Sequence, residues 1–238
     1  MDDYSLRPAG DTALVVDFGN RIEIDLSKKV LALARRLDAL HLDGVLETVP
    51  TIRSLSVYYE PLTITAAALE KKIAEILDGL RDAPAEGRRW VIPVCYDPSL
   101  APDLHEVAER CNMSVDQLVA LHSGTTYHAY MLGFLPGLAY LGDLPEKLVL
   151  PRRNAPRPRI PGGSLGMAAK MTCIFPMATP CGLHLIGRSP VALWDQHSEN
   201  GALLSAGDKV RFEPITLQEF ERMQRDGAAA CLEAQLYH

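Results

Sequence analysis

Alternating strand-like and helix-like patterns fill the first eighty residues. Apolar, β-branched runs at residues 12–18, 45–49 and 55–59 predict three strands, and the short connection between the last two favours a hairpin. Apolar residues at steps of three and four predict one helix beginning near Asp25 and a second helix with Thr65 as its N-cap. Their apolar faces consist of Leu26, Val30, Leu33, Leu37 and Leu40, and of Leu69, Ile73, Ile76 and Leu80. The order strand, helix, strand, strand, helix is typical of a split βαβ unit with helices on one face of a small sheet.

A change in pattern marks a boundary after this unit. Residues 82–89 are polar and contain proline and glycine, which favours a linker. We therefore expect an α+β domain at residues 1–84 and a second domain at residues 88–238. From residue 125 to residue 211, short apolar runs alternate with Gly and Pro, which predicts an all-β barrel or sandwich.

Short helices are expected at both ends of this second domain. A strand-like run at residues 90–96 precedes two short helical segments. Ser114 and Gln117 have the spacing of a capping box at the second segment, and Thr216 and Glu219 repeat that spacing at a terminal helix. The Ala-rich end beyond that helix is expected to fray.

Composition and charge exclude several function classes. Of 238 residues, 47% are hydrophobic and 23% are charged, which is typical of a folded globular protein. The formal net charge of -6 and the scattered basic residues argue against a nucleic-acid partner. Neither a signal peptide nor an apolar stretch of about 20 residues is present, so we expect a cytoplasmic protein that does not enter a membrane.

The cysteines and histidines show no metal-binding spacing. There is neither a CxxC pair nor an HExxH pattern, so we expect reduced thiols and no metal site. The five cysteines are Cys95, Cys111, Cys173, Cys181 and Cys231. His184 lies in an apolar run and is interpreted as a core residue. His122 and His128 precede a Gly- and Pro-rich segment, where either could carry a proton or cap a helix.

That segment, GFLPGLAYL at residues 133–141, combines residues that shape the backbone with residues that offer apolar surface. Gly133, Pro136 and Gly137 fix the path of the chain, whereas Phe134 and Tyr140 supply aromatic rings. The pattern fits either a shaped binding loop or an ordinary tight turn that closes a barrel.

Four arginines are interleaved with prolines in PRRNAPRPRIPGGS, residues 151–164. Prolines hold such a segment extended, and guanidinium groups match carboxylates and phosphates, so an anion site is one interpretation. A solvated basic loop, or one whose arginines pair with carboxylates on a neighbouring subunit, is the alternative. The closing PGGS could bring backbone N–H groups and the Ser164 hydroxyl to a ligand, or form a simple turn before a strand. It is neither a P-loop nor a GxSxG elbow.

These segments together resemble a known family. LHSGTTYHAYMLGFLPGLAYLGDLPEKLVLPRRNAPRPRIPGGSLGMA, followed by IFP, MATP and LIGR, is similar to the B subunit of ATP-dependent 5-oxoprolinase. The family is also known as allophanate hydrolase subunit 1, the carboxyltransferase subdomain C/D family and the Kip-type inhibitors of a sporulation histidine kinase. The resemblance covers nearly the whole chain and is strongest over residues 121–188.

The resemblance implies a fold and a reaction. It implies a small α+β N-terminal domain and a cyclophilin-like β-barrel, in agreement with the residue pattern. It further implies an enzyme component that works with two partners, a homologous C subunit and a separate A subunit, to open the ring of 5-oxoproline at the expense of ATP. Because this chain has no nucleotide-binding motif, ATP is expected to act through the complex, and the chain alone is expected to be inactive.

Two other functions are implied by other members of the family. One is a regulatory protein that inhibits a histidine kinase. The other is a biotin-dependent carboxyltransferase of the urea amidolyase type, which moves a carboxyl group from carboxybiotin to urea. The small-molecule substrate is accordingly expected to be an amide or a carboxylate.

The resemblance also assigns residues to one pocket. Arg152 and Arg157 match the family's PRxxxPR pattern and are expected to hold a substrate carboxylate or phosphorylated intermediate. The other expected pocket residues are Gly133, Phe134, Pro136, Gly137 and Tyr140 from GFxPGxxYL, and Pro161, Gly163 and Ser164 from PxGS. His122 and Ser164 are the catalytic candidates.

The chain departs from the family pattern at two places. Where the family commonly has Gly-x-Gln-Thr, residues 169–172 read AKMT, so Met171 replaces a polar residue. Where the family has PGGW, residues 180–183 read PCGL, which places Leu183 at the position of the Trp. A thioether lacks the donor and acceptor capacity of an amide, so we expect these changes to alter substrate preference.

Overall fold

The computed structural model describes residues 4–80, 87–198 and 200–226. The chain divides into two compact units, Met1–Glu86 and Gly87–His238. No helix within the described ranges has the length and apolarity of a membrane span. Cys231 and the Ala-rich end lie outside the described residues.

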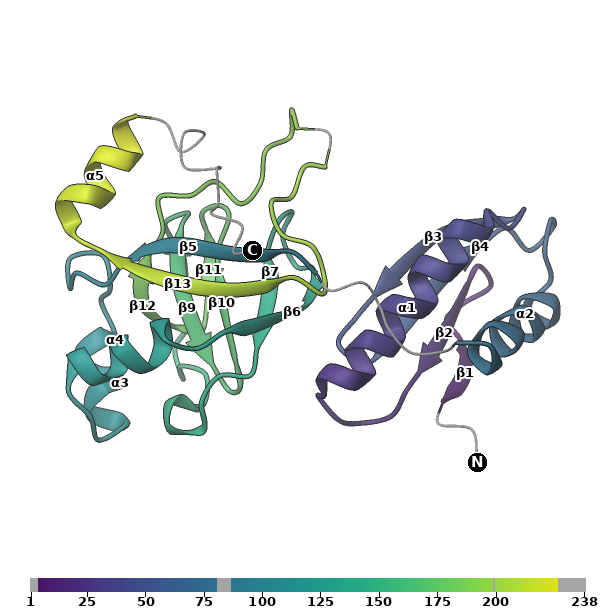
Figure 1. Cartoon of the computed structure of the whole chain (residues 1–238), viewed down its shortest axis with the longest axis horizontal. Helices are drawn as coiled ribbons and strands as arrows, with labels where there is room; N and C mark the ends of the chain where they lie inside the picture. Colours follow the sequence, from purple (N-terminus) through teal and green to yellow (C-terminus); the bar gives the residue numbers. More distant parts are fainter. Residues whose placement is uncertain (1–3, 81–86, 199, 227–238) are drawn as a thin grey trace. The chain divides into compact units, whose positions relative to one another are not determined.

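The first unit is a four-stranded antiparallel sheet with two helices (Figure 1). The strand order is β1-β2-β4-β3, so β4 lies between the two strands that α1 connects, and the predicted split βαβ unit is confirmed. Its elements are β1 (Ser5–Pro8), β2 (Ala13–Asp17), α1 (Ile24–Leu40), β3 (Val45–Pro50), β4 (Ser54–Tyr59) and α2 (Ala66–Asp78). The apolar faces of both helices share one core with the sheet.

Local sequence signals account for most of these boundaries. The side chain of Thr65 caps α2 by accepting a hydrogen bond from the backbone N–H of Ala68, as predicted. α1 ends at His41, which adopts a left-handed conformation with φ 44°. β1 is not predicted by the sequence pattern, because this four-residue edge strand is mostly exposed and ends in Pro8.

The second unit is a closed barrel of seven strands, in the order β10-β7-β6-β13-β5-β12-β9. The expected all-β architecture is thus a barrel, and its fold is cyclophilin-like. The barrel strands are β5 (Arg89–Cys95), β6 (Tyr127–Leu132), β7 (Ala139–Gly142), β9 (Ser164–Ala168), β10 (Met171–Ile174), β12 (His184–Arg188) and β13 (Lys209–Ile215). A separate two-stranded sheet pairs β8 (Arg157–Ile160) with β11 (Thr179–Cys181).

Helices pack against the outside of the barrel (Figure 1). These are α3 (Leu104–Arg110), which contacts β12, α4 (Val115–Ser123), which contacts β13, and α5 (Leu217–Arg225), which contacts β5; a 3-10 turn, η1 (Glu146–Leu148), follows β7. Both predicted capping boxes are confirmed, at Ser114 with Gln117 and at Thr216 with Glu219. The expected terminal helix is therefore present.

Candidate functional site

A cavity of about 220 Å³ lies beside the barrel strands β7 and β10 and the short strand β11. Such a volume suits a small molecule rather than a cofactor, since drug-sized pockets begin at about 300 Å³. Its walls are mostly apolar. The lining residues are Phe134, Leu138, Tyr140, Arg152, Ala168, Ala169, Met171, Thr172, Cys173, Phe175, Pro180, Cys181, Gly182 and Leu183.

Arg152 brings a positive charge to this cavity. Its side chain is exposed, and among the residues that the structure describes it forms no hydrogen bond or ion pair. The segment that carries it is tied to the cavity wall, because the backbone N–H of Arg153 donates to the carbonyl of Gly182 over 2.9 Å. Arg152 is thus available to a ligand on a fixed piece of backbone.

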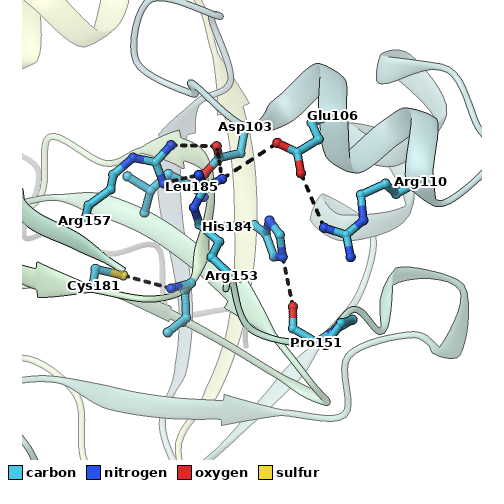
Figure 2. A network of polar contacts seen from close by, with 10 residues as sticks. Asp103, Glu106, Arg110, Pro151, Arg153, Arg157, Cys181, His184 and Leu185 are labelled. Atoms are coloured by element: carbon cyan, nitrogen blue, oxygen red, sulfur yellow. Dashed lines mark hydrogen bonds and ion pairs between the residues drawn. The ribbon is translucent and has the colours of Figure 1, made fainter. Parts of the chain in front are cut away.

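The neighbouring arginines are engaged by a buried carboxylate, Asp103, as Figure 2 shows. Arg157 donates from Nη1 to Oδ2 over 2.8 Å and from Nη2 to Oδ1 over 2.6 Å, while Arg153 donates from Nη1 to Oδ1 over 2.8 Å. The backbone N–H of Leu185 on β12 donates to Oδ2 over 2.7 Å. We call Asp103, Arg153 and Arg157 the Asp103 clamp.

The clamp fixes the ionisation of Asp103. The carboxylate is 2% exposed, and burial by itself would raise its pKa. The hydrogen bonds from Arg157 and Leu185 and the two guanidinium charges outweigh burial, so the pKa of Asp103 is lowered. The hydrogen bonds to Asp103 correspondingly raise the pKa of Arg157. Asp103 and Arg157 are therefore both charged at neutral pH.

Two further contacts hold the arginine segment in place (Figure 2). The carbonyl of Pro151 accepts a hydrogen bond from Nε2 of the buried His184 over 2.9 Å, and because a carbonyl can only accept, Nε2 carries the proton. On α3, Glu106 lies 3.7 Å from Arg153 and 3.3 Å from Arg110. The clamp, His184 and Gly182 together position the residues on both sides of Arg152.

The expected pocket residues separate into two groups. Phe134, Tyr140 and Arg152 line the cavity, together with Met171 and Leu183, where the sequence departs from the family pattern. The remaining expected residues do not line it: Gly133, Pro136, Gly137, Arg157, Pro161, Gly163 and Ser164. The structure thus places Arg157 against Asp103 rather than at the cavity.

Gly137 and Gly163, in the turns before β7 and β9, have a structural role instead, because they allow a backbone path that other residues do not. Gly137 has φ 76°, and a Cβ atom there would lie 2.6 Å from the carbonyl oxygen of Leu193. Gly163 has φ 80°, and a Cβ atom there would lie 2.3 Å from the carbonyl oxygen of Ser189. Only glycine fits such positions without strain. The hydroxyl of Ser164, which is 2% exposed, donates to the carbonyl of Pro161 over 2.8 Å and closes the second turn.

Phe134 has an unusual conformation at the cavity. Its φ is 69°, in the left-handed region that a bulky residue rarely adopts, and its side chain is 69% exposed. A strained, exposed aromatic residue beside a cavity is a typical feature of a binding site. Its turn is held by the backbone N–H of Gly133, which donates to the carbonyl of Leu138 over 3.1 Å.

His122 is fully buried behind the cavity wall. It stacks on Phe212 with ring centroids 5.0 Å apart, and burial lowers its pKa to about 3. Its Nε2 lies 3.2 Å from the hydroxyl of Thr172, a lining residue, and its Nδ1 lies 3.0 Å from the hydroxyl of Tyr96. The imidazole is therefore neutral at pH 7 and reaches the cavity only through Thr172.

Two thiols also face the cavity, and the sequence pattern does not distinguish them from ordinary buried cysteines. Burial raises the pKa of both Cys173 and Cys181, so each is a neutral thiol at pH 7. Both are free cysteines in the structure, as are Cys95 and Cys111. The thiols add weak polarity to the wall without adding charge.

The first unit has a wider depression of about 520 Å³, and each of the two arginines that line it already contacts another side chain. Arg7 lies 3.6 Å from Asp17, and Arg53 donates a hydrogen bond to Asn20. The cavity with Arg152 is therefore the better candidate for an anionic ligand.

Sequence reasoning missed Asp103. It precedes the helix α3 and has the residue type of an ordinary N-cap, yet its carboxylate makes no capping bond and binds arginines 50 and 54 residues away. The alternative in which the arginines pair with carboxylates placed those carboxylates on a neighbouring subunit, whereas Asp103 belongs to the same chain.

Comparison with known proteins gives a consistent family match. The sequence model of the carboxyltransferase domain, subdomain C and D, matches residues 4–204. The B subunit of 5-oxoprolinase from Bacillus subtilis (strain 168) is 32% identical over 237 residues, covering 94% of this chain and 98% of that protein. The B subunit of 5-oxoprolinase from Escherichia coli O157:H7 is 36% identical over 206 residues, covering 86% and 93%.

Solved structures extend the match to the fold. TTHA0988 superposes with a TM-score of 0.76 at 34% identity, over 89% of this chain and 40% of that chain, so this chain spans less than half of TTHA0988. The urea amidolyase of K. lactis superposes with a TM-score of 0.78 at 18% identity, over 94% of this chain and 16% of that chain. The second likeness shows a common fold.

Proposed function

Because this chain belongs to the family of the carboxyltransferase domain, subdomain C and D, we propose that it is one component of an ATP-dependent 5-oxoprolinase-type complex. Relatives named as the B subunit of 5-oxoprolinase match it over most of their length. In this proposal the barrel cavity binds the substrate, a cyclic amide that carries a carboxylate, and the complex acts in the cytoplasm.

The main support for the proposal is that the arginines of this segment have different contacts. Arg153 and Arg157 are engaged by Asp103, whereas Arg152 lines the cavity and pairs with no described residue. A guanidinium facing a small, mostly apolar cavity favours a carboxylate, because a charge-assisted hydrogen bond is stronger where water is displaced.

The proposal assigns ATP to the partner proteins. The sequence has no P-loop, and the cavity of about 220 Å³ is small for a nucleotide. We infer that a C subunit and an A subunit supply phosphoryl transfer and the rest of the active site, and that the chain alone does not turn over substrate. The match to 40% of TTHA0988 supports a partner, because that protein joins a chain like this one to a longer remainder.

Reconstitution tests the proposal. The chain is co-expressed with homologues of the A and C subunits, and glutamate released from 5-oxoproline is measured with and without ATP. We expect ATP-dependent release that is lost when any of the three chains is omitted. A folded, stable complex that releases no glutamate would exclude this function.

A biotin-dependent carboxyltransferase is the second candidate. It is favoured by the description of the family and by a 22% identical match to the urea amidolyase of Lachancea kluyveri, of which this chain covers 14%. Biotin would be the cofactor of that complex. Avidin separates the two functions, because it blocks transfer from carboxybiotin and leaves an ATP-dependent lactam hydrolase active.

A further inference from the structure

The side chains that line the cavity offer one formal charge and few other hydrogen-bonding groups. Among the lining residues that the structure describes, Arg152 carries that charge. Scaling from an apolar cavity of about 150 Å³ that holds benzene, a cavity of this size holds a ligand of about nine non-hydrogen atoms. The ligand is therefore a compact anion. The other lining side chains determine which uncharged groups of the ligand are recognised.

Two polar side chains in the wall, Thr172 and Cys181, are engaged by the protein. The hydroxyl of Thr172 donates to the carbonyl of Gly166 over 3.0 Å, so the nearby Nε2 of His122 must donate to that hydroxyl. The Sγ atom of Cys181 accepts from the backbone N–H of Leu183 over 3.2 Å. These groups have little capacity left for a ligand.

The hydroxyl of Tyr140 is a second polar group at the Arg152 side. Burial raises the pKa of Tyr140, and the positive charge of Arg152 has a smaller, opposite effect. The phenol is therefore protonated at neutral pH. A protonated phenol can donate one hydrogen bond. Arg152 and Tyr140 both line the cavity, so each can donate a hydrogen bond to a carboxylate bound there.

Apolar and thioether groups supply the rest of the wall. Met171 and Leu183 line the cavity with Leu138 and Phe175, and neither Met171 nor Leu183 offers a strong donor or acceptor. A ring amide placed against them would give up its hydrogen bonds to water without replacement, which costs free energy. Ring carbons placed against the same side chains would lose no hydrogen bonds.

We propose that the cavity recognises a compact carboxylate through its charge and the carbons of its ring, that it does not recognise a ring amide, and that Met171 determines this preference. The inference rests on the proposed function for the role of the site and deepens it.

Binding to the full-length chain tests this specificity. Titration calorimetry compares cyclopentanecarboxylate, 5-oxoproline and the neutral cyclopentanecarboxamide. We expect cyclopentanecarboxylate to bind about tenfold more tightly than 5-oxoproline, which corresponds to one unsatisfied polar group. The carboxamide should bind at least about tenfold more weakly than the carboxylate, and Arg152→Gln should remove that difference.

Substitution of Met171 is the most direct test of its role in this preference. Met171→Gln introduces an amide that can pair with the lactam, so it should shift the affinity ratio about tenfold toward 5-oxoproline. Met177→Gln is the matched control, because Met177 is 36% exposed and does not line the cavity, and it should leave the ratio unchanged. Circular dichroism confirms that each variant is folded.

The proposal is overturned if 5-oxoproline binds the unsubstituted chain more tightly than the carbocycle, if Met171→Gln leaves the ratio unchanged, or if the folded chain binds neither carboxylate. Its failure is separable from that of the proposed function. If the reconstituted complex turns over substrate and the chain clearly prefers the lactam, only this inference is excluded. If the chain binds carboxylates in an Arg152-dependent way but the complex shows no turnover, only the proposed function is excluded.

Discussion

Arg157 and Asp103 form a bidentate ion pair inside the second unit, with N–O distances of 2.8 and 2.6 Å. The pair joins the strand β8 to the start of α3, and Arg153 adds a third hydrogen bond to the same carboxylate. Because two of the four arginines in this segment are used in this way, the segment is ordered without a ligand. Arg152 is thereby left at the cavity as a positioned cation.

Asp103→Asn should lower the free energy of unfolding by about 2 kcal/mol. The substitution keeps the side-chain volume but leaves Arg157 without its counter-ion and Arg153 with only Glu106, 3.7 Å away; the partial exposure of both arginines moderates the loss. Urea-induced unfolding followed by circular dichroism measures it. Glu106→Gln is the matched control, since Glu106 is 51% exposed and its ion pairs contribute less than about 1 kcal/mol. An unchanged midpoint for Asp103→Asn would contradict the clamp.

The clamp should also lose its effect in acid. The pKa of Asp103 in the folded chain lies below its ordinary value of 3.8, so its stabilisation is complete above about pH 5 and disappears as the pH falls through the folded pKa. The difference in unfolding free energy between the unsubstituted chain and Asp103→Asn should be constant from about pH 5 to 8 and shrink below about pH 4. A difference that grows in acid would show that Asp103 acts in another way.

His122 should make the chain less stable as the pH falls from about 6.5. Its pKa is about 3 when folded, so over this range the unfolded chain binds a proton that the folded chain does not. The resulting slope is about 1.4 kcal/mol per pH unit. His122→Gln retains a donor and an acceptor for Thr172 and Tyr96 but cannot titrate, so its unfolding free energy should vary less between about pH 4 and 6. Identical slopes would mean that His122 is protonated in the folded chain.

Gly163→Ala should destabilise the barrel by at least about 2 kcal/mol. The methyl group would lie 2.3 Å from a backbone oxygen at a left-handed position, and each of these conditions is costly. Gly182→Ala is the control, because the nearest atom to its methyl group would be 3.8 Å away. Thermal unfolding of the two variants compares them directly, and similar midpoints would count against a backbone role for Gly163.

Periodicity and capping predicted the elements well. The split βαβ unit, the all-β second half and both capping boxes follow from local signals, because apolar spacing and N-cap chemistry act over a few residues. The closed barrel could not be distinguished from a sandwich in this way. Closure depends on pairing between distant strands, such as β13 with β5, which a local pattern does not reveal.

The site was only partly predictable for the same reason. Motif positions led to Phe134, Tyr140 and Arg152 at the cavity, but they grouped Arg157 with Arg152 although the two side chains lie in different surroundings. The difference depends on Asp103, which is 54 residues from Arg157 in the sequence. Proximity created by the fold, rather than residue type, separates the ligand-facing arginine from the structural one.

The most direct test of the central claim compares Arg152→Gln with Arg157→Gln in the reconstituted complex. If Arg152 faces the ligand and Arg157 holds the fold, Arg152→Gln raises the KM for 5-oxoproline at least about tenfold and leaves the thermal midpoint unchanged. Arg157→Gln instead lowers the thermal midpoint by about 4 °C. An Arg152→Gln complex with an unchanged KM and kcat, beside an Arg157→Gln complex with a raised KM and full stability, would contradict the assignment.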